Sequence, residues 1–274
     1  MVLFPVIHSN GGRAQYANGV TFEHLTNATN LPCNAHIAFP WRTEPLAVYT
    51  LNLKKLTDAE TAVIENFFLA QFGRYGQFAY IDPTGNLLQY SDDYAQAPWT
   101  KACLVGGSLA DPAGGTAAKL LSGNGSGNSS LTQTVSIDPS VAGSVACFSV
   151  YLKAITAPGA FNVYLTDGTT TTNVACVLTL GTWTRVSVPW TFGASGLVTV
   201  GVGGNAKWTG ANQIAMFGPM LCMTTGAAVY LRTPGFAALR PLCRFDQDVL
   251  DIAYRAPNQN DVTLKIVEFA PTAP

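Results

Sequence analysis

The stretches Val145-Ala-Cys-Phe-Ser-Val-Tyr-Leu152 and Trp183-Thr-Arg-Val-Ser-Val-Pro-Trp190 show the pattern that decides the fold. In both, apolar side chains alternate with polar or small ones, as they do when one face of a β-strand is buried. Similar stretches, rich in Val, Thr and aromatic residues, lie at residues 161–166, 173–180, 197–202 and 213–221. Gly, Pro or Asp-Gly breaks separate them at intervals of about 11–16 residues, which is typical of an antiparallel β-sandwich.

This region carries very little charge. Residues 104–231 hold four basic and three acidic side chains, whereas the rest of the 274-residue chain holds 24 charged residues. A nearly uncharged block between two ordinary flanks indicates a domain inserted into another. The net charge of −1 gives no basis for electrostatic binding to nucleic acid or to an anionic membrane surface, so neither is expected as a partner.

The first flank predicts one α-helix, at about residues 58–72. Thr57 is expected to be its N-cap, and Glu60, three residues later, completes a capping box. Gly73 is expected to follow the helix end. The apolar face is expected to consist of Val63, Ile64, Phe67, Phe68 and Phe72, with Thr61, Glu65, Asn66 and Gln71 facing out.

Short strands and turns are expected on both sides of this helix. The predicted strands lie at residues 13–16, 20–25, 36–41, 47–53 and 77–81, with hairpin turns at 10–12 and 18–19. Near the C-terminus, residues 262–269 alternate as a strand and resemble the first flank in composition. We expect this strand to fold back against residues 1–83 and complete one sheet system.

The six cysteines, at positions 33, 103, 147, 176, 222 and 243, contain no C-x-x-C pair. Several of them stand in apolar runs, so we expect buried, reduced thiols that act as small hydrophobic residues. The even count leaves disulfides open. The first eight residues lack a basic n-region, and no apolar run approaches the ~20 residues of a membrane span, so assembly in a reducing cytoplasm without membrane insertion is expected.

A search for catalytic or metal-binding residues points away from an enzyme. The three histidines, His8, His24 and His36, have no metal-ligand spacing, and neither a metal nor a cofactor is expected. The acids of the uncharged block are Asp111, Asp138 and Asp167, and each stands beside Pro or Gly, which predicts a turn role. The pair Asp92-Asp93 is likewise assigned to a turn, because two carboxylates do not make a calcium site.

The ligand-binding candidates are aromatic. A neutral surface rich in hydroxyls and amides, with flat rings, suits a sugar, because the C–H faces of a sugar stack on aromatic rings. Trp208, Trp190, Tyr164 and Trp99 are the candidate glycan-binding residues. Trp183 is expected instead to fill the sandwich core.

The run Leu87-Leu-Gln-Tyr-Ser-Asp-Asp-Tyr-Ala-Gln-Ala-Pro-Trp-Thr-Lys101 resembles the opening of a carbohydrate-binding-like β-sandwich common in tailed-phage structural proteins. Similar landmarks follow at residues 148–153, 183–188, 217–221 and 227–231. Met220 and Cys222 replace a polar pair of that family. The resemblance spans residues 87–233 and implies a jelly-roll-like sandwich.

The flanks resemble, more weakly, the distal tail (tail-hub) or minor tail proteins of tailed phages. The matching points are Phe4-Pro5, Gly11-Gly12, Phe67-Phe68, Gly73, Phe78, Asp82, residues 244–246 and residues 267–268. That resemblance implies a mainly β protein with two β-sandwich domains: a discontinuous framework of residues 1–86 and 234–274, and an inserted module of residues 87–233. It also implies rings, commonly hexameric, that join the tail tube to hub and baseplate proteins.

The resulting hypothesis is a non-enzymatic component of a phage tail tip, located in the virion and assembled in the host cytoplasm. Two roles are open for the inserted module: contact with host surface glycan, strengthened by several copies on a ring, or bracing of the baseplate. The alternative is a carbohydrate-binding adhesin or receptor-binding protein at the tail tip.

Overall fold

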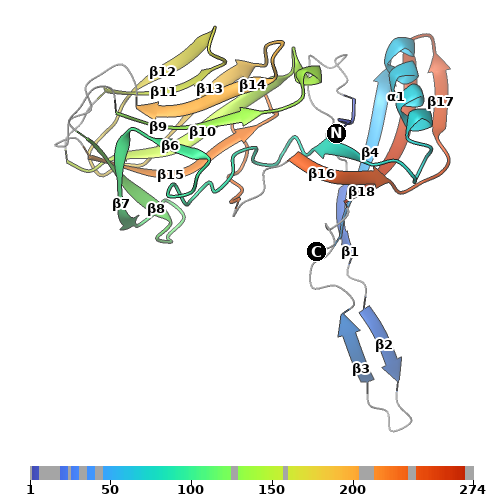
Figure 1. Ribbon diagram of the computed structural model, residues 1–274, viewed down its shortest axis with the longest axis horizontal. Helices are drawn as coiled ribbons and strands as arrows, with labels where there is room; N and C mark the ends of the chain where they lie inside the picture. The colour runs from blue at the N-terminus through green and yellow to red at the C-terminus, as the bar shows by residue number, and fades with distance from the viewer. Residues whose placement is uncertain are drawn as a thin grey trace. The chain divides into compact units, whose positions relative to one another are not determined.

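Figure 1 shows a computed structural model of the chain. It describes residues 2–5, 19–23, 26–30, 36–40, 46–124, 129–156, 160–203, 213–233 and 239–268. The described residues form two compact units. The terminal unit takes its residues from 1–80 and 240–274, and the central unit consists of residues 81–239.

The central unit is a sandwich of two five-stranded antiparallel sheets. One sheet has the order β13 (Thr184–Thr191), β10 (Val145–Ala154), β15 (Gln213–Cys222), β8 (Ala118–Gly123), β7 (Cys103–Leu109). The other has the order β12 (Thr171–Val177), β11 (Ala160–Thr166), β14 (Leu197–Gly203), β9 (Ser130–Ser136), β6 (Trp99–Lys101). Alternate residues such as Phe148, Val163 and Val200 are completely buried between the sheets. The prediction of a mainly β, sandwich-like fold is confirmed.

All six strands expected from the alternating stretches are present, but four others were missed. These are β6 to β9, which occupy residues 99–136 together with their connections. The expected loop at residues 121–130 is too long, because β8 continues to Gly123 and β9 begins at Ser130. Strand β8 has neighbours on both sides, so its pairing does not depend on an alternating pattern of its own.

The terminal unit is built on one six-stranded sheet. Its order is β1 (Gly19–Glu23), β4 (Leu46–Leu56), β18 (Gln259–Glu268), β16 (Leu239–Phe245), β5 (Phe78–Ile81), and β17 (Asp251–Ala256) also pairs with β18. A separate two-stranded sheet joins β2 (Thr26–Asn30) to β3 (His36–Pro40). Because Lys265 lies opposite Thr50, the last strand does return to the sheet of the first flank. The strand and turn predicted at residues 10–16 lie outside the described residues.

Helix α1 (Asp58–Ala70) packs against β4 and β18. The capping box is confirmed: the Glu60 amide donates to Thr57 Oγ1 at 3.2 Å, and the Thr57 amide donates to Glu60 Oε2 at 2.9 Å. The helix ends two residues before the predicted position. Phe72 already has a left-handed backbone with φ of 52°, and Gly73 follows with φ of 61°.

The predicted apolar face of α1 is only partly correct. Ile64 and Phe68 are buried, but Val63 is 49% exposed and Phe72 is 77% exposed. Thr61, which was expected to face out, is buried, and its hydroxyl bonds both the N-cap of its own helix and the neighbouring strand β18. It donates to the Thr57 carbonyl at 2.9 Å and accepts from Asn260 Nδ2 of β18 at 3.0 Å. Among the described helices, none is long and apolar enough to cross a lipid bilayer.

An aromatic cluster joins α1 to strands from both ends of the sequence. The Phe245 ring centroid lies 4.8 Å from that of Phe78 and 4.9 Å from that of Phe68. Phe4 and Phe67 complete the cluster, with Phe67 lying edge-on to Phe4 at 5.7 Å. Phe245 and Phe78 are fully buried, so this cluster is the centre of the terminal unit's core.

The side chain of Asn86 ties together the segments by which the chain enters and leaves the central unit. Its Oδ1 accepts from the amides of Leu88 and Leu221, both at 3.1 Å. Its Nδ2 donates to the carbonyls of Pro219 at 3.0 Å and Leu231 at 3.1 Å. Asn86 is 1% exposed, so these bonds are shielded from water.

A second set of bonds continues this connection. The Ser91 amide donates to the Thr233 carbonyl at 3.1 Å, and the Thr233 amide donates to Ser91 Oγ at 2.9 Å. The Thr233 hydroxyl also donates to the Leu88 carbonyl at 2.6 Å. The entering segment, residues 86–91, and the leaving segment, residues 231–233, therefore lie side by side.

Candidate ligand site

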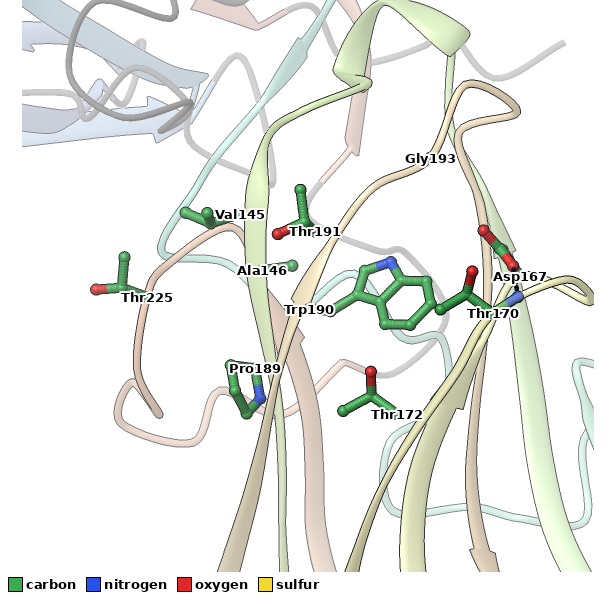
Figure 2. Close-up of a pocket in the computed structure, with 10 residues that line it drawn as sticks. All are labelled: Val145, Ala146, Asp167, Thr170, Thr172, Pro189, Trp190, Thr191, Gly193 and Thr225. Atoms are coloured by element: carbon green, nitrogen blue, oxygen red, sulfur yellow. Dashed lines mark hydrogen bonds between the residues drawn. The ribbon is translucent and has the colours of Figure 1, made fainter.

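A cavity of about 490 Å³ lies at the end of β13 in the central unit (Figure 2). Its volume falls in the range usual for small-molecule sites. Asp167 is the one ionisable side chain among the residues that line it. The lining consists of Val145, Ala146, Asp167, Thr170, Thr172, Pro189, Trp190, Thr191, Gly193 and Thr225.

Trp190 is the aromatic centre of the site. Residues 186, 188 and 190 are buried while their neighbours on β13 are more exposed, so the indole points into the sandwich edge. It is 6% exposed, and its Nε1–H has no acceptor among the described residues. In Figure 2 the six-membered ring is directed toward Thr170. A buried donor without an acceptor costs about 1–3 kcal/mol.

Asp167 supplies a fixed negative charge to the same cavity. Its Oδ1 accepts from the amide of Thr170 at 2.7 Å and from that of Thr169 at 2.9 Å, and these bonds lower the pKa of the carboxyl group. Its Oδ2 receives no hydrogen bond from the described residues. Oδ2 faces Gly193, where an added Cβ would lie 2.9 Å away, so a side chain there would crowd this oxygen.

These groups favour a neutral, hydroxyl-rich ligand. Asp167 can accept hydrogen bonds from hydroxyls, Thr170 and Thr172 can donate or accept, and Trp190 offers both apolar surface and an N–H donor. No Lys or Arg lines the cavity, so an anionic ligand would meet only the charge of Asp167. The lowered pKa keeps that carboxylate ionised at neutral pH and makes it an acceptor, not an acid catalyst.

Of the three predicted glycan-binding residues that the structure describes, only Trp190 lines this cavity. Tyr164 is half-buried on β11 and packs over Gly201. Trp99 is 3% exposed; its Nε1 donates to the Tyr90 carbonyl at 2.9 Å, so it is a core residue without an open ring face. Trp208 lies outside the described residues.

Two further sequence expectations differ from the structure. Trp183 was expected in the core, but it precedes β13 and is half-buried, with Lys153 Nζ 4.7 Å from its ring centroid. Thr170 and Thr172 were missed as candidate site residues. The Asp167-Gly168 turn was visible in the sequence, but its position beside Trp190 depends on which strands form the sandwich edges.

The turn roles of the three acids in the uncharged block are confirmed. Asp111 accepts three backbone amides, those of Ala113, Gly115 and Ala117, and Asp138 accepts the amide of Ser140. Together with the turn bonds of Asp167, these interactions lower the pKa of all three carboxyl groups. A glycoside hydrolase needs a carboxylic acid with a raised pKa, which none of them provides. No group of three or more potential metal ligands occurs in the described part of the chain.

We expect the substitution Asp111→Asn to destabilise the central unit by about 1–2 kcal/mol at pH 7, because the new amide nitrogen cannot accept from Ala117. The pKa of Asp111 is lower in the folded chain than in the unfolded chain, where it is about 3.9. The ionised carboxylate therefore stabilises the fold at pH values above about 3.9, and this stabilisation is lost as the pH falls through the folded pKa. Urea unfolding at pH 7 and pH 3 should show the difference from wild type shrinking at pH 3. Asp251→Asn, at an exposed position, is the control, and a pH-independent difference would refute the explanation.

No protein-family model matches the sequence, and no curated protein does. Similar solved structures include a C-terminal family 22 carbohydrate-binding module of Clostridium thermocellum Xyn10B (TM-score 0.40, 16% identity, 54% of this chain and 99% of that one). They also include TmCBM61 in complex with β-1,4-galactotriose (TM-score 0.38, 16% identity, 51% and 99%). A third is the enzymatically active domain of tailspike protein 4 from bacteriophage CBA120 (TM-score 0.39, 12% identity, 53% and 22%).

Proposed function

We propose that the central unit binds a neutral glycan in the cavity around Trp190. The observation that carries the proposal is the Trp190 side chain: it lines a cavity that also holds the Asp167 carboxylate and threonine hydroxyls, and its buried Nε1–H has no acceptor among the described residues. A sugar ring supplies what these groups lack: hydroxyls for the carboxylate and the indole N–H, and C–H surface for the ring.

The decisive variant is Trp190→Phe, tested in the full-length chain. A glycan array first identifies a neutral oligosaccharide, and calorimetric titration then measures its affinity. Phe keeps the aromatic ring but removes Nε1–H, so we expect about tenfold weaker binding. Thermal stability should be unchanged or slightly higher, because the donor has no acceptor in the described protein.

Asp167→Asn provides a second test of the same site. The amide oxygen can still accept from Thr169 and Thr170, while the charge at Oδ2 is lost, so binding should weaken with little change in unfolding. Asp138→Asn is the matched control, because Asp138 has the same turn role outside this cavity. Equal affinity of wild type, Trp190→Phe and Asp167→Asn would refute the site, and no binding on the array would refute the function.

We propose as a second function that the terminal unit serves as the framework of a phage tail-tip ring. In this proposal residues 1–86 and 234–274 form the framework, residues 87–233 are inserted in it, and the ring contacts tail tube and hub proteins. Two observations support it. Strands β4 and β18 of the terminal unit come from opposite ends of the chain and pair directly. Within the central unit, residues 86–91 and 231–233 lie side by side, as expected at the ends of an inserted module.

Mass photometry of the full chain tests the ring. We expect a closed oligomer near six copies, visible as rings by negative-stain microscopy, which would place several glycan sites on one particle and strengthen weak binding. A monomer at micromolar concentration would refute the ring. If that monomer still bound glycan through Trp190, the protein would be an adhesin or receptor-binding protein instead.

A further inference from the structure

Two buried cysteines of the central unit face each other across neighbouring strands. The five described cysteines are all buried, as the sequence predicted, and no disulfide joins them. Cys147 of β10 lies directly opposite Cys222 of β15 in the antiparallel register. The other three cysteines lie opposite residues of other kinds: Cys103 opposite Gly123, Cys176 opposite Phe161 and Cys243 opposite Glu268.

Direct opposition brings the two side chains close to disulfide geometry. Residues facing each other in an antiparallel pair have Cβ atoms about 4.5–5.5 Å apart. A disulfide requires Cβ atoms about 3.5–4.5 Å apart and Cα atoms about 4.4–6.8 Å apart. Side-chain rotation with a slight approach of the strands is therefore enough to join the two sulfur atoms.

The surroundings of the pair hinder its oxidation in the folded chain. Cys147 is 1% exposed and Cys222 is fully buried, in a cluster with Met220 that is covered by Ala228 and Tyr230. Burial raises the pKa of the Cys147 thiol to about 11, with a further contribution from Cys222. Because the thiolate is the reactive form, oxidation requires the covering segment to open, or must take place during folding.

The same segment is held partly by Cys222. The Cys222 Sγ atom lies 2.9 Å from the Thr224 hydroxyl, at the start of residues 224–233. Further along, the Tyr230 hydroxyl bonds Ser91, and Arg232 forms an ion pair with Asp92. A disulfide between Cys222 and Cys147 would remove the contact of the Cys222 sulfur with Thr224. It would also add a covalent link between β15 and β10, which already pair in the sheet.

We propose that Cys147 and Cys222 are a site of disulfide formation between β10 and β15, closed by exchange with a low-molecular-weight disulfide such as oxidised glutathione. The first thiolate attacks the reagent and releases one reduced thiol. The second thiolate then attacks this mixed disulfide and releases another. The two cysteines together lose two protons and two electrons, and the reagent disulfide is reduced to two thiols.

The test is to refold the full chain from denaturant in a glutathione redox buffer. Both thiols are exposed to the buffer in the unfolded chain, so they can react before they become buried. We expect an intact mass lower by two hydrogens, a cross-linked peptide containing Cys147 and Cys222, and a thermal midpoint higher by about 5–10 °C. The native chain in the same buffer should reach the same product more slowly.

Variants identify the sulfur atoms involved. Cys147→Ser and Cys222→Ser, made separately, should each abolish the mass change and the rise in thermal midpoint, whereas Cys176→Ser should keep both. Peptide mapping of wild type gives an answer even if a variant folds poorly. The proposal is overturned if both thiols remain free in refolded wild type, or if the cross-link joins another pair of cysteines.

Discussion

Replacing Asn86 with alanine should destabilise the central unit by about 3–5 kcal/mol, a large fraction of the stability of a typical domain. The substitution leaves two buried amides, those of Leu88 and Leu221, without an acceptor. It also removes the donor for the carbonyls of Pro219 and Leu231. Asn86 is 1% exposed, so bulk water does not reach these four backbone groups to replace the lost side chain.

Urea unfolding followed by tryptophan fluorescence measures this effect, because Trp99 and Trp190 are buried in the central unit. Asn173→Ala is the matched control: Asn173 lies at an exposed position of β12, so its loss should change stability by no more than about 0.5 kcal/mol. A similarly small change for Asn86→Ala would mean that the entering and leaving segments are not held together by this side chain.

The second large effect is expected for Phe245→Ala, which should destabilise the terminal unit by about 3–5 kcal/mol. Phe245 is fully buried and contacts the rings of Phe68 and Phe78, so its removal opens a cavity between α1 and the sheet. Loss of helical circular dichroism with urea reports on this unit, because α1 is the one α-helix in the described residues.

Tyr254→Ala is the control for this substitution, since Tyr254 is 70% exposed on β17 in the same C-terminal region. It should shift the unfolding midpoint only slightly. If Phe245→Ala were equally mild, the C-terminal strands would contribute little to the core of the terminal unit. The proposal of a framework built from both ends of the chain would then lose its physical basis.

Much of the fold could be predicted from the sequence because the relevant interactions are local. The capping box joins Thr57 to Glu60 over three residues, and the alternating side chains of β13 need only a buried and an exposed face. Strand β7 escaped prediction because Gly106 and Gly107 interrupt its pattern. It forms nevertheless, because β8 pairs with residues 103–105 and 108–109 on both sides of the two glycines, where the register shifts.

The candidate site was only partly predictable for the same reason. The sequence predicts Trp190 and Trp99 as sugar-binding residues for the same reason, an aromatic ring in or beside a region with little charge. Trp99 nevertheless lies in the core, where its N–H donates to the Tyr90 carbonyl. Nothing local separates the two. The difference lies in what surrounds each ring: Trp99 packs edge-on against Tyr94, whereas Trp190 lies beside the β11–β12 turn and its Asp167 carboxylate.

The amino-acid sequence by itself determined the β-rich class, the position of the one helix, the turn roles of the acids and the nearly uncharged surface, because each depends on neighbouring residues or on composition. Only the tertiary structure decided that Thr61 is buried, that Asn86 holds four backbone groups, that Cys147 faces Cys222 and that Trp190 borders a cavity. These properties depend on partners as many as 199 residues away in the chain. Such partners meet only when strand order and register bring them together.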